Sequence, residues 1–430
     1  MADAGTVARP TGRRGLEFVL VVFALGLGVF AYALVGLGRT GKVPVNLTGV
    51  GALFAVLFGV AHVANRVLAP RSHGLLLGLA TLLNVIGYAV VSRLDAHLAA
   101  NQAEWMVVGV GAYLATLLVA RDYAVLDRYR YTLAFIGLAL LLAPLSPLGL
   151  EINGSRLWVS LGSLTFQPGE LAKVLLVVFF ASYLAERAEL LATSTRKVGP
   201  LPVPAFRHFG PLLLAWGASL AVLFYERDLG QSMLLFAIFL GMLWVATGRA
   251  AYVFIGLVLF AASALYAYRT FEHLHVRIEI WRHPFGDVLG RSYQIAQSLF
   301  ALGSGGIGGS GLARGSPDLI PYAPTDFVYS AIGEELGVIG AAAVLVAYLL
   351  LVGTALRAAL LNPDPFGKLL ASGLAISLGF QSFVVVGGVT RLVPLTGITL
   401  PFISYGGSSL VSSYVLIAML VSVSQGRGDP

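Results

Sequence analysis

The chain contains no cysteine and very little charge. The absence of cysteine from its 430 residues excludes disulfide bonds, thiolate metal ligands and thiol nucleophiles. Charged side chains make up 11% of the chain, whereas soluble domains carry about 25%. Hydrophobic residues make up 57%, which is more apolar surface than a soluble core can bury. The composition therefore excludes an ordinary soluble protein and indicates a chain that lives in a lipid bilayer.

Long apolar runs recur from Leu16 to Ser424. Runs of about 18 residues or more can cross a hydrocarbon layer about 30 Å thick as helices. Leu, Val, Ala and Gly fill them without strict alternation, which disfavours barrel strands. They predict an all-α polytopic membrane protein with about twelve transmembrane helices and a large extracytoplasmic loop. The expected spans are residues 17–38, 49–67, 74–92, 103–120, 131–149, 169–186, 209–225, 229–247, 251–268, 327–355, 367–388 and 404–424.

Basic residues recur in alternate loops between these runs. With the N-terminus placed inside, they fall on one side of the membrane, which the positive-inside rule assigns to the cytoplasm. The even number of spans returns the C-terminus to that side, so both termini are expected in the cytoplasm. The net charge of +7 follows from these loops, and no nucleic-acid partner is expected. The residues are Arg9, Arg13, Arg14, Arg66, Arg71, Arg121, Arg128, Arg130, Arg187, Arg196, Lys197, Arg207, Arg249, Arg357, Lys368 and Arg427.

Most of the unusual chemistry falls in the segments that this orientation leaves outside. These are residues 269–326, 149–168 and 389–403. The first of them contains Arg277 and Trp281, then a Pro/Gly turn that ends in Asp287, then Gln294. An aspartate beside arginines and a tryptophan can pair with a cation, cap a helix or serve as a base. Composition alone leaves these three roles open.

A glycine-rich run, GSGGIGGSG, occupies residues 303–311 and contains a formal G-x-G-x-x-G spacing. A dinucleotide fingerprint requires a preceding strand and a surrounding βαβ unit, whereas this run follows an expected helix on the outer face. The dinucleotide-binding interpretation is therefore rejected. The run is either a mobile loop or a place where the backbone closely approaches a phosphate or sugar.

Several charged residues lie at the ends of apolar runs. Asp326 precedes one run, and Glu335 lies within its first turns. Charges in lipid are costly and usually face a bundle interior or a wet cavity. Glu170 and Lys173 begin another run at i and i+3, so they share a helix face and can pair. This pair is either a structural ion pair that joins helices or part of a polar substrate path.

Residues 393–409 interrupt an apolar stretch with two prolines and three glycines. This segment contains Ser404 and follows directly after Arg391 and Leu392. Non-helical backbone at membrane depth is tolerated only where protein or a water-filled cavity satisfies it. The segment is therefore expected to line a cavity.

The order and sequences of these motifs resemble those of the FtsW, RodA and SpoVE family of division, elongation and sporulation proteins. The motifs are QPGELAK, the Trp-x-x-Pro loop with its Asp, GSGGIGGSG, TDF followed by GEELG, and PLTGITLPFISYGGSS, spread over residues 74–424. The chain length and Thr390-Arg391-Leu392 incline the resemblance toward the RodA-like branch. Family members usually have about ten spans. The resemblance therefore implies a core at residues 74–430, preceded by a tail and two additional, uncleaved helices at residues 1–73.

The resemblance implies a peptidoglycan glycosyltransferase that polymerises lipid II on the outer face of the bacterial cytoplasmic membrane, for elongation or division. The family's catalytic carboxylate falls on Asp287. Attack of a hydroxyl on an α-linked sugar pyrophosphate inverts the linkage, and needs one base and a cationic group on the leaving pyrophosphate. Arg156, Arg277, Arg391 or a divalent cation, Mg²⁺ or Mn²⁺, would supply that charge. No organic cofactor is expected.

Further substrate contacts and partners are implied in the same way. The implied partners are lipid II, membrane lipids and a class B penicillin-binding protein with an outer transpeptidase domain. The remaining candidate substrate-binding residues are Glu170, Lys173, Trp281, Gln294, Asp326, Glu335 and Ser404.

Two other classes of function fit part of the pattern. A lipid II flippase would also use cavity-lining charges such as Glu170 and Lys173, and a non-catalytic scaffold of the wall-synthesis complex would need neither. A flippase needs polar groups along a path but has no need of a base on its outer face. Asp287 beside basic residues therefore favours the enzyme.

Overall fold

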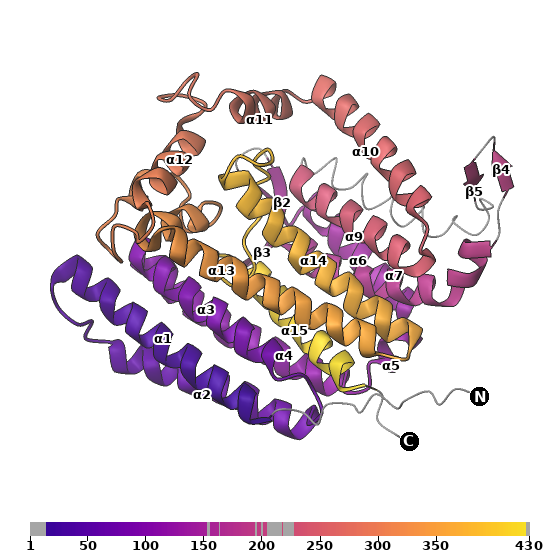
Figure 1. Cartoon of the computed structure of the whole chain (residues 1–430), viewed down its shortest axis with the longest axis horizontal. Helices are drawn as coiled ribbons and strands as arrows, with labels where there is room; N and C mark the ends of the chain where they lie inside the picture. The colour runs from indigo at the N-terminus through magenta and orange to yellow at the C-terminus, as the bar shows by residue number, and fades with distance from the viewer. Residues whose placement is uncertain are drawn as a thin grey trace.

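The computed structural model describes residues 14–152, 155–162, 164–193, 196–198, 201–203, 217 and 228–426. Most of them belong to a bundle of long helices (Figure 1). Within the described residues, nine helices are long and apolar enough to cross a membrane. The bundle helices are α1 (Arg14–Thr40), α2 (Leu47–Leu68), α3 (Leu75–Leu94), α4 (Ala96–Val119), α5 (Ala124–Arg128), α6 (Arg130–Leu142), α7 (Pro168–Thr193), α9 (Leu229–Thr247), α10 (Ala250–Thr270), α13 (Val328–Leu361), α14 (Pro365–Val389) and α15 (Gly407–Gln425).

The predicted spans agree with these helices, except for one span that ends early and one that lies outside the described residues. Residues 131–149 were expected to form a single helix, but α6 and a following 3₁₀ turn, η1 (Ala143–Leu145), end at Leu145. Pro144 has no N–H to continue the helical ladder, and the chain then enters a strand. The span expected at residues 209–225 lies outside the described residues. The multi-pass helical class is confirmed.

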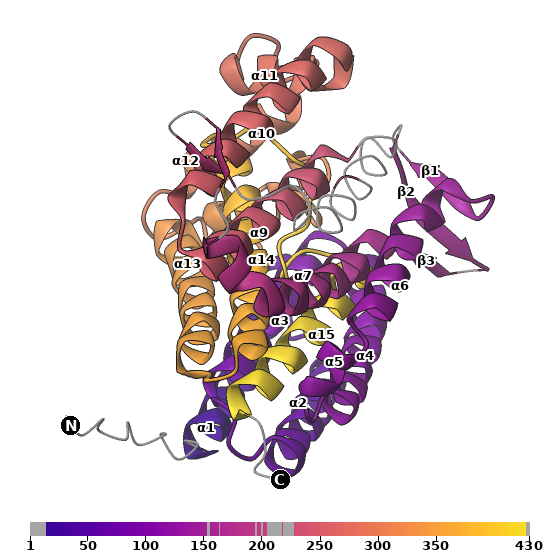
Figure 2. The same cartoon turned by 90° about the vertical axis from the view of Figure 1, so that its right-hand side faces the viewer.

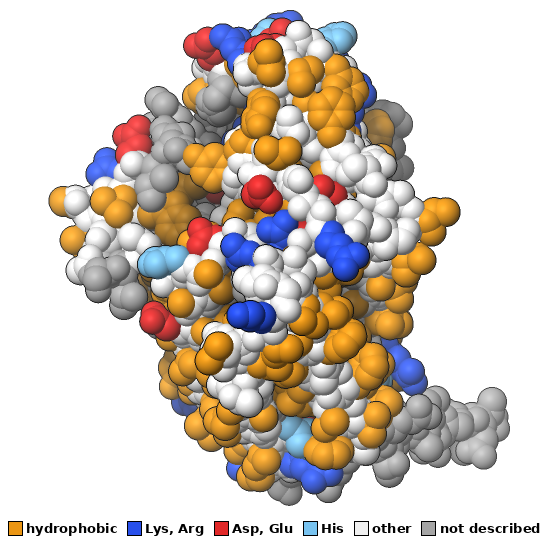
Figure 3. All heavy atoms as spheres, turned by 90° about the vertical axis from the view of Figure 1, so that its left-hand side faces the viewer, with side chains coloured by type: hydrophobic (Ala, Val, Ile, Leu, Met, Phe, Trp, Pro, Cys, Tyr) orange, Lys and Arg blue, Asp and Glu red, His pale blue; other side chains and the backbone are white. Residues whose placement is uncertain are grey.

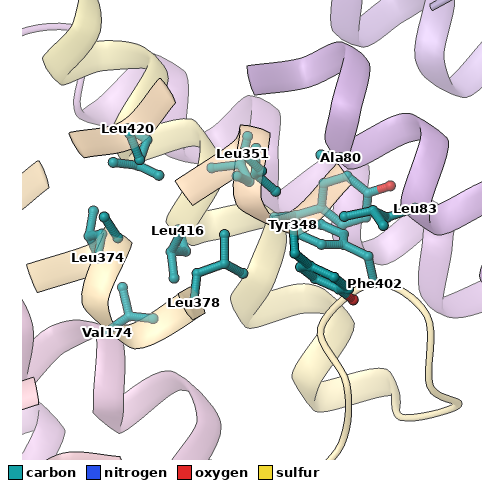
Figure 4. Packing of buried hydrophobic residues seen from close by; sticks show 14 of the residues in the cluster. Ala80, Leu83, Val174, Tyr348, Leu351, Leu374, Leu378, Phe402, Leu416 and Leu420 are labelled. Atoms are coloured by element: carbon teal, nitrogen blue, oxygen red, sulfur yellow. The ribbon is translucent and has the colours of Figure 1, made fainter. Parts of the chain in front are cut away.

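The core of the bundle lies around α3, α14 and α15. Most of α15, 89% of its span, is buried, whereas only 12% of the α10 span is buried. Figure 4 shows side chains from α3, α7, α13, α14, α15 and the segment before α15 converging on this core. Its labelled residues are Ala80, Leu83, Val174, Tyr348, Leu351, Leu374, Leu378, Phe402, Leu416 and Leu420. Phe402 belongs to the interrupted segment 393–409, so this part of the segment packs in the core, whereas Leu395 and Gly397 line a pocket, as expected for the segment.

Two small sheets are additions to the predicted helices. A three-stranded antiparallel sheet consists of β1 (Gly149–Ile152), β2 (Ser155–Leu161) and β3 (Leu164–Phe166). It projects from the same end of the bundle as α11 (Figure 2). In β2, the aliphatic residues Leu157, Val159 and Leu161 recur at every second position, which is the strand period. A two-stranded pair, β4 (Arg196–Val198) and β5 (Leu201–Val203), lies between α7 and α9 in the chain.

The expected outer loop, residues 269–326, is largely folded. It contains α11 (Glu272–Arg282), α12 (Tyr293–Gly305) and the 3₁₀ turn η2 (Pro317–Leu319). In Figure 1, α11 bridges the top of the molecule between α10 and α12. The face shown in Figure 3 has charged side chains from its top to its central part and again at its lower end, and a largely hydrophobic band lies between these two regions. This distribution suits a protein whose hydrophobic band faces lipid.

Candidate active site

Asp287 lies in the turn that joins α11 to α12. Its Oδ2 accepts a hydrogen bond from the backbone N–H of Arg291 at 2.9 Å, and its backbone carbonyl accepts one from Ser292 at 3.1 Å. A Cβ at Gly290 would lie only 2.3 Å from Oδ2, so a larger residue at this position would displace the Asp287 carboxylate. Among the described residues, Asp287 forms no ion pair with a guanidinium group. The carboxylate is held by its own turn and remains exposed.

A pocket of about 110 Å³, with both polar and apolar lining, opens between α11, α12, the start of α13 and the segment after α14. Its polar lining consists of Arg277, Trp281, Arg291, Gln294 and Asp326. Ile280, Ile295, Phe327 and Leu395 supply much of the apolar lining. The pocket thus brings together the predicted loop residues Arg277, Trp281 and Gln294 with Asp326, which was predicted at the helix end. Arg291, which was not predicted as a site residue, also lines it.

Arg277 is the cation that reaches deepest into this arrangement. One of its Nη atoms donates to the backbone carbonyl of Thr396 at 3.1 Å. Burial raises the pKa of the Asp326 carboxyl, while the Thr325 hydroxyl and the charge of Arg277 oppose the rise. The pocket therefore holds a cation and a partly desolvated carboxylate together, which suits it to a polar, anionic ligand.

Trp281 and Arg391 fasten the end of α11 to the end of α14. The indole Nε1 donates to the Arg391 carbonyl at 3.1 Å, and the Arg391 guanidinium donates to the carbonyls of Trp281 and Arg282, each at 2.9 Å. These carbonyls belong to the last turn of α11, which has no helical partners for them. A wider hollow of about 490 Å³ lies here, lined by Trp281, Arg282, His283, Thr390 and Arg391.

Ser404 connects the interrupted segment to the residues before α13. Its hydroxyl donates to the backbone carbonyl of Thr325 and accepts from the N–H of Leu400 at 3.0 Å. The N–H of Tyr405 donates to the Pro324 carbonyl at 2.8 Å. Ser404 therefore supports the position of neighbouring Asp326 and does not itself line the pocket.

The predicted ion pair between Glu170 and Lys173 forms inside the bundle, so that expectation is confirmed. Nζ lies 3.0 Å from Glu170 Oε2 and 2.7 Å from the Gln381 amide oxygen, and the Ser412 hydroxyl donates to Glu170 at 3.2 Å. Both charged side chains are only 3% exposed. The network joins α7, α14 and α15 beneath the pocket region, and none of its members lines the pocket.

Glu335 and Arg156 are also held away from the pocket. Glu335 forms a 2.8 Å ion pair with Arg93 of α3. Arg156 projects from β2 and donates to the carbonyl of Ser146 at 3.2 Å. The glycine-rich run lies against α13, where the N–H groups of Ser310 and Gly311 donate to the carbonyls of Glu334 and Glu335. The run does make a close backbone approach, but its partner is a helix.

Sequence reasoning did not select Asp228 or Arg93. Asp228 caps α9 by accepting the Gln231 N–H at 2.9 Å, and its place directly before an apolar run is a recognisable cap signal. Burial raises its pKa to about 6, against the opposing effects of Gln231 and Arg277. Arg93 ends an apolar span, where it looks like an ordinary flanking charge. Its partner Glu335 is 242 positions away, so no local pattern reveals the pair.

The fold and the pocket define a multi-pass helical membrane protein with an anion-suited pocket in the segments at one end of the bundle. The family model described as a cell cycle protein, covering FtsW, RodA and SpoVE, matches residues 68–428. The chain belongs to the FtsW, RodA and SpoVE family.

Relatives with curated names agree with this assignment. RodA of Mycobacterium tuberculosis, named a peptidoglycan glycosyltransferase, is 43% identical over 439 residues, which cover 99% of this chain and 93% of the relative. A Geobacter protein named as a probable peptidoglycan glycosyltransferase FtsW is 37% identical over 308 residues, which cover 70% of this chain and 80% of the Geobacter protein.

Solved structures show the same fold. A chain from a peptidoglycan synthase complex that coordinates polymerization and crosslinking matches with a TM-score of 0.67 and 26% identity, over 81% of this chain and 96% of that chain. The crystal structure of RodA from Thermus thermophilus matches with a TM-score of 0.57 and 27% identity, over 83% of this chain and 97% of that chain.

Proposed function

We propose that this peptidoglycan glycosyltransferase polymerises lipid II into glycan strands on the outer face of the bacterial cytoplasmic membrane, with Asp287 as the general base. The observation that carries the proposal is the pocket lined by Arg277, Arg291 and Asp326, next to the turn that presents an exposed Asp287. A pyrophosphate needs cationic partners, and a reacting hydroxyl needs a base that can be reached from solvent.

The reaction follows from these groups. The acceptor sugar hydroxyl attacks C1 of the donor sugar while Asp287 takes the hydroxyl proton. A β-glycosidic C–O bond forms, the α-linked C1–O bond to phosphate breaks, and its electron pair leaves on the undecaprenyl pyrophosphate. Arg277 and Arg291 stabilise the charge that develops on that pyrophosphate. A single displacement inverts the configuration at C1.

The other pocket residues orient the substrate. Trp281 offers an apolar ring face to a sugar, and the Gln294 amide offers both a donor and an acceptor. Arg391 acts through Trp281 and the end of α11, because its guanidinium donates to two carbonyls of that helix end and it does not line the pocket. Glu170, Lys173, Ser404 and Glu335 act through the packing around the pocket, and Arg156 acts through the β1–β3 sheet.

A divalent cation, Mg²⁺ or Mn²⁺, is proposed as a companion of the pyrophosphate. Among the described residues, no three His, Asp or Glu side chains gather as a ready-made metal site. Mg²⁺ commonly binds through one or two carboxylates together with substrate phosphates and waters. Asp326, which lines the pocket, is the residue that would hold it there. The cation would supply charge neutralisation to the leaving group.

We also propose a class B penicillin-binding protein as partner, with both termini of this chain in the cytoplasm. The matched synthase complex, which couples polymerization to crosslinking, supports the partner. The alternate basic loops support the orientation. The two helices before the matched region, α1 and α2, are proposed as an addition to the family core.

The direct test is incubation of the purified full chain with lipid II, with and without the penicillin-binding partner, followed by separation of any glycan polymer. We expect polymer in both samples and more with the partner. Transport of lipid II across vesicles with no polymer formed would support a flippase instead. Binding of the partner without either activity would support a scaffold.

A further inference from the structure

Arg93 is a buried cation at the end of α3, and the chemistry proposed above does not use it. Its side chain is only 10% exposed. Nε donates to Glu335 Oε1 at 2.8 Å, and Nη2 donates to the Gly315 carbonyl at 3.0 Å. Nη2 also approaches an Asp318 oxygen at 3.5 Å. A charge this deeply buried persists only when it is paired and hydrogen-bonded, so this guanidinium joins α3, α13 and residues 310–318.

Residues 310–318, here called the clasp loop, wrap around the start of α13. Two adjacent carboxylates hold the loop by its backbone. Glu335 Oε2 accepts from the Ala313 N–H at 3.0 Å, and Glu334 Oε1 accepts from the Ser316 N–H at 2.7 Å. Arg93 neutralises Glu335 and binds the Gly315 carbonyl between these two points. Charge-assisted hydrogen bonds therefore hold the loop through both its backbone N–H groups and a backbone carbonyl.

A continuous series of turns leads from the clasp loop to the pocket. Each turn is closed by a backbone hydrogen bond of 3.1 or 3.2 Å, namely Leu319 to Ser316, Ile320 to Pro317, Ala323 to Ile320, and Asp326 to Tyr322. The far end is held by Ser404 and Tyr405. Asp326 thus lies between two anchors, and the clasp loop is one of them.

We propose that Arg93 is a positioning residue for glycosyl transfer. With Glu335 it anchors the clasp loop, and through the turns that follow it holds Asp326 at the pocket. The proposal rests on the proposed function, because the place of Asp326 matters for catalysis only if the pocket binds the sugar pyrophosphate. Asp326 itself is the group that faces the substrate, while Arg93 acts at a distance.

The N-terminal helix α1 packs against the same clasp. A Cβ at Gly38 would lie 2.6 Å from the Leu312 carbonyl oxygen, so only glycine permits this contact. Arg39 donates to the Ser92 carbonyl, directly before Arg93, at 3.3 Å. The helix lies outside the residues matched by the family model. Helix α1 therefore contacts both the clasp loop and the end of α3 that carries Arg93.

The test combines loop mobility with reaction rate in the full-length protein. Arg93→Met with Glu335→Gln removes the ion pair without leaving a buried charge unpaired. Arg130→Met with Glu186→Gln is the control, because it removes another arginine–carboxylate pair, of 2.6 Å and more exposed, that joins α6 to α7. A spin label on Ser316→Cys reports the clasp loop, and one on Ala100→Cys in α4 reports the rest of the bundle.

We expect the first pair of substitutions to mobilise the Ser316 label, to leave the Ala100 label unchanged, and to lower the rate at saturating lipid II by about 10- to 100-fold. The control pair should change neither the label nor the rate. An immobile Ser316 label, or a mobile label with the normal rate, would overturn the proposal.

A milder variant covers the case in which the double substitution does not fold. Arg93→Lys keeps the charge next to Glu335 but loses the fork that also binds Gly315. We expect partial mobility of the Ser316 label and a smaller loss of rate. An unchanged label in Arg93→Lys would count against the clasp. The mobility of the label does not depend on glycosyl transfer. Failure of the clasp proposal is therefore distinguishable from failure of Asp287 as the general base.

Discussion

Some residue pairs in this protein can be predicted from local sequence spacing, whereas others form only because the fold brings distant segments together. The i, i+3 spacing of Glu170 and Lys173 predicts their ion pair, and the structure contains it. The third partner, Gln381, lies 208 positions from Lys173, so spacing could not reveal it. The same holds for Arg93 and Glu335, which pair only because α3 and α13 pack together.

The buried pair gives the first prediction. Glu170→Gln leaves the Lys173 ammonium in the bundle with no anionic partner, and breaking such a pair costs about 3–5 kcal/mol. We expect a lower unfolding temperature in detergent and a lower yield. Adding Lys173→Met should recover much of the stability. If the single variant unfolds at the wild-type temperature, the pair does not stabilise the bundle.

The second prediction concerns Asp228 and pH. Burial raises the pKa of its carboxyl from 3.8 to about 6, so the ionised form is disfavoured in the folded state. The cost, on the order of 3 kcal/mol, is fully present above pH 6 and is relieved as the pH falls toward 4. Asp228→Asn keeps the cap and removes this dependence.

Thermal unfolding at several pH values measures the effect. Between pH 7 and 4.5 the wild type should gain stability relative to Asp228→Asn. The matched control is Asp95→Asn, which alters another helix cap, at α4, where the side chain is half-buried. Parallel pH profiles for the wild type and Asp228→Asn would contradict the assignment.

At the scale of secondary-structure elements, the apolar runs predict the long helices well because lipid demands about 20 apolar residues for each span. The outer elements are harder to predict. The strands β1–β3 and the helices α11 and α12 are short, and their positions depend on contacts with distant segments. The glycine-rich run illustrates the difficulty. Its composition allows a mobile loop, yet its backbone is fixed by α13, which is kinked at Gly337.

The contact between that run and α13 gives the third prediction. A Cβ at Gly309 would lie 2.2 Å from the Glu335 carbonyl oxygen, and Gly309 has φ +80°. Gly309→Ala should therefore destabilise the protein by more than 1–2 kcal/mol, the usual cost of that backbone conformation alone. Gly308→Ala, where the Cβ would meet nothing within 4 Å, is the control. Equal unfolding temperatures for the two variants would refute the packing.

At the scale of the whole molecule, the orientation in the membrane can be tested with the chain's own lack of cysteine. Ser316 and Pro363 are exposed and lie on opposite sides in the predicted topology. An impermeant thiol reagent applied to intact cells should label Ser316→Cys and spare Pro363→Cys. Labelling of position 363 alone would reverse the orientation and place the pocket in the cytoplasm.

The central claim is that Asp287 removes the proton from the acceptor hydroxyl, and one substitution tests it most directly. Asp287→Asn keeps the shape of the side chain and its place in the turn but removes its basicity. With purified protein and contaminating glycosyltransferases excluded, lipid II polymerisation should fall by about two to four orders of magnitude, while folding, lipid II binding and association with the partner persist. Polymerisation by Asp287→Asn at nearly the wild-type rate would contradict the assignment and direct attention to Asp326.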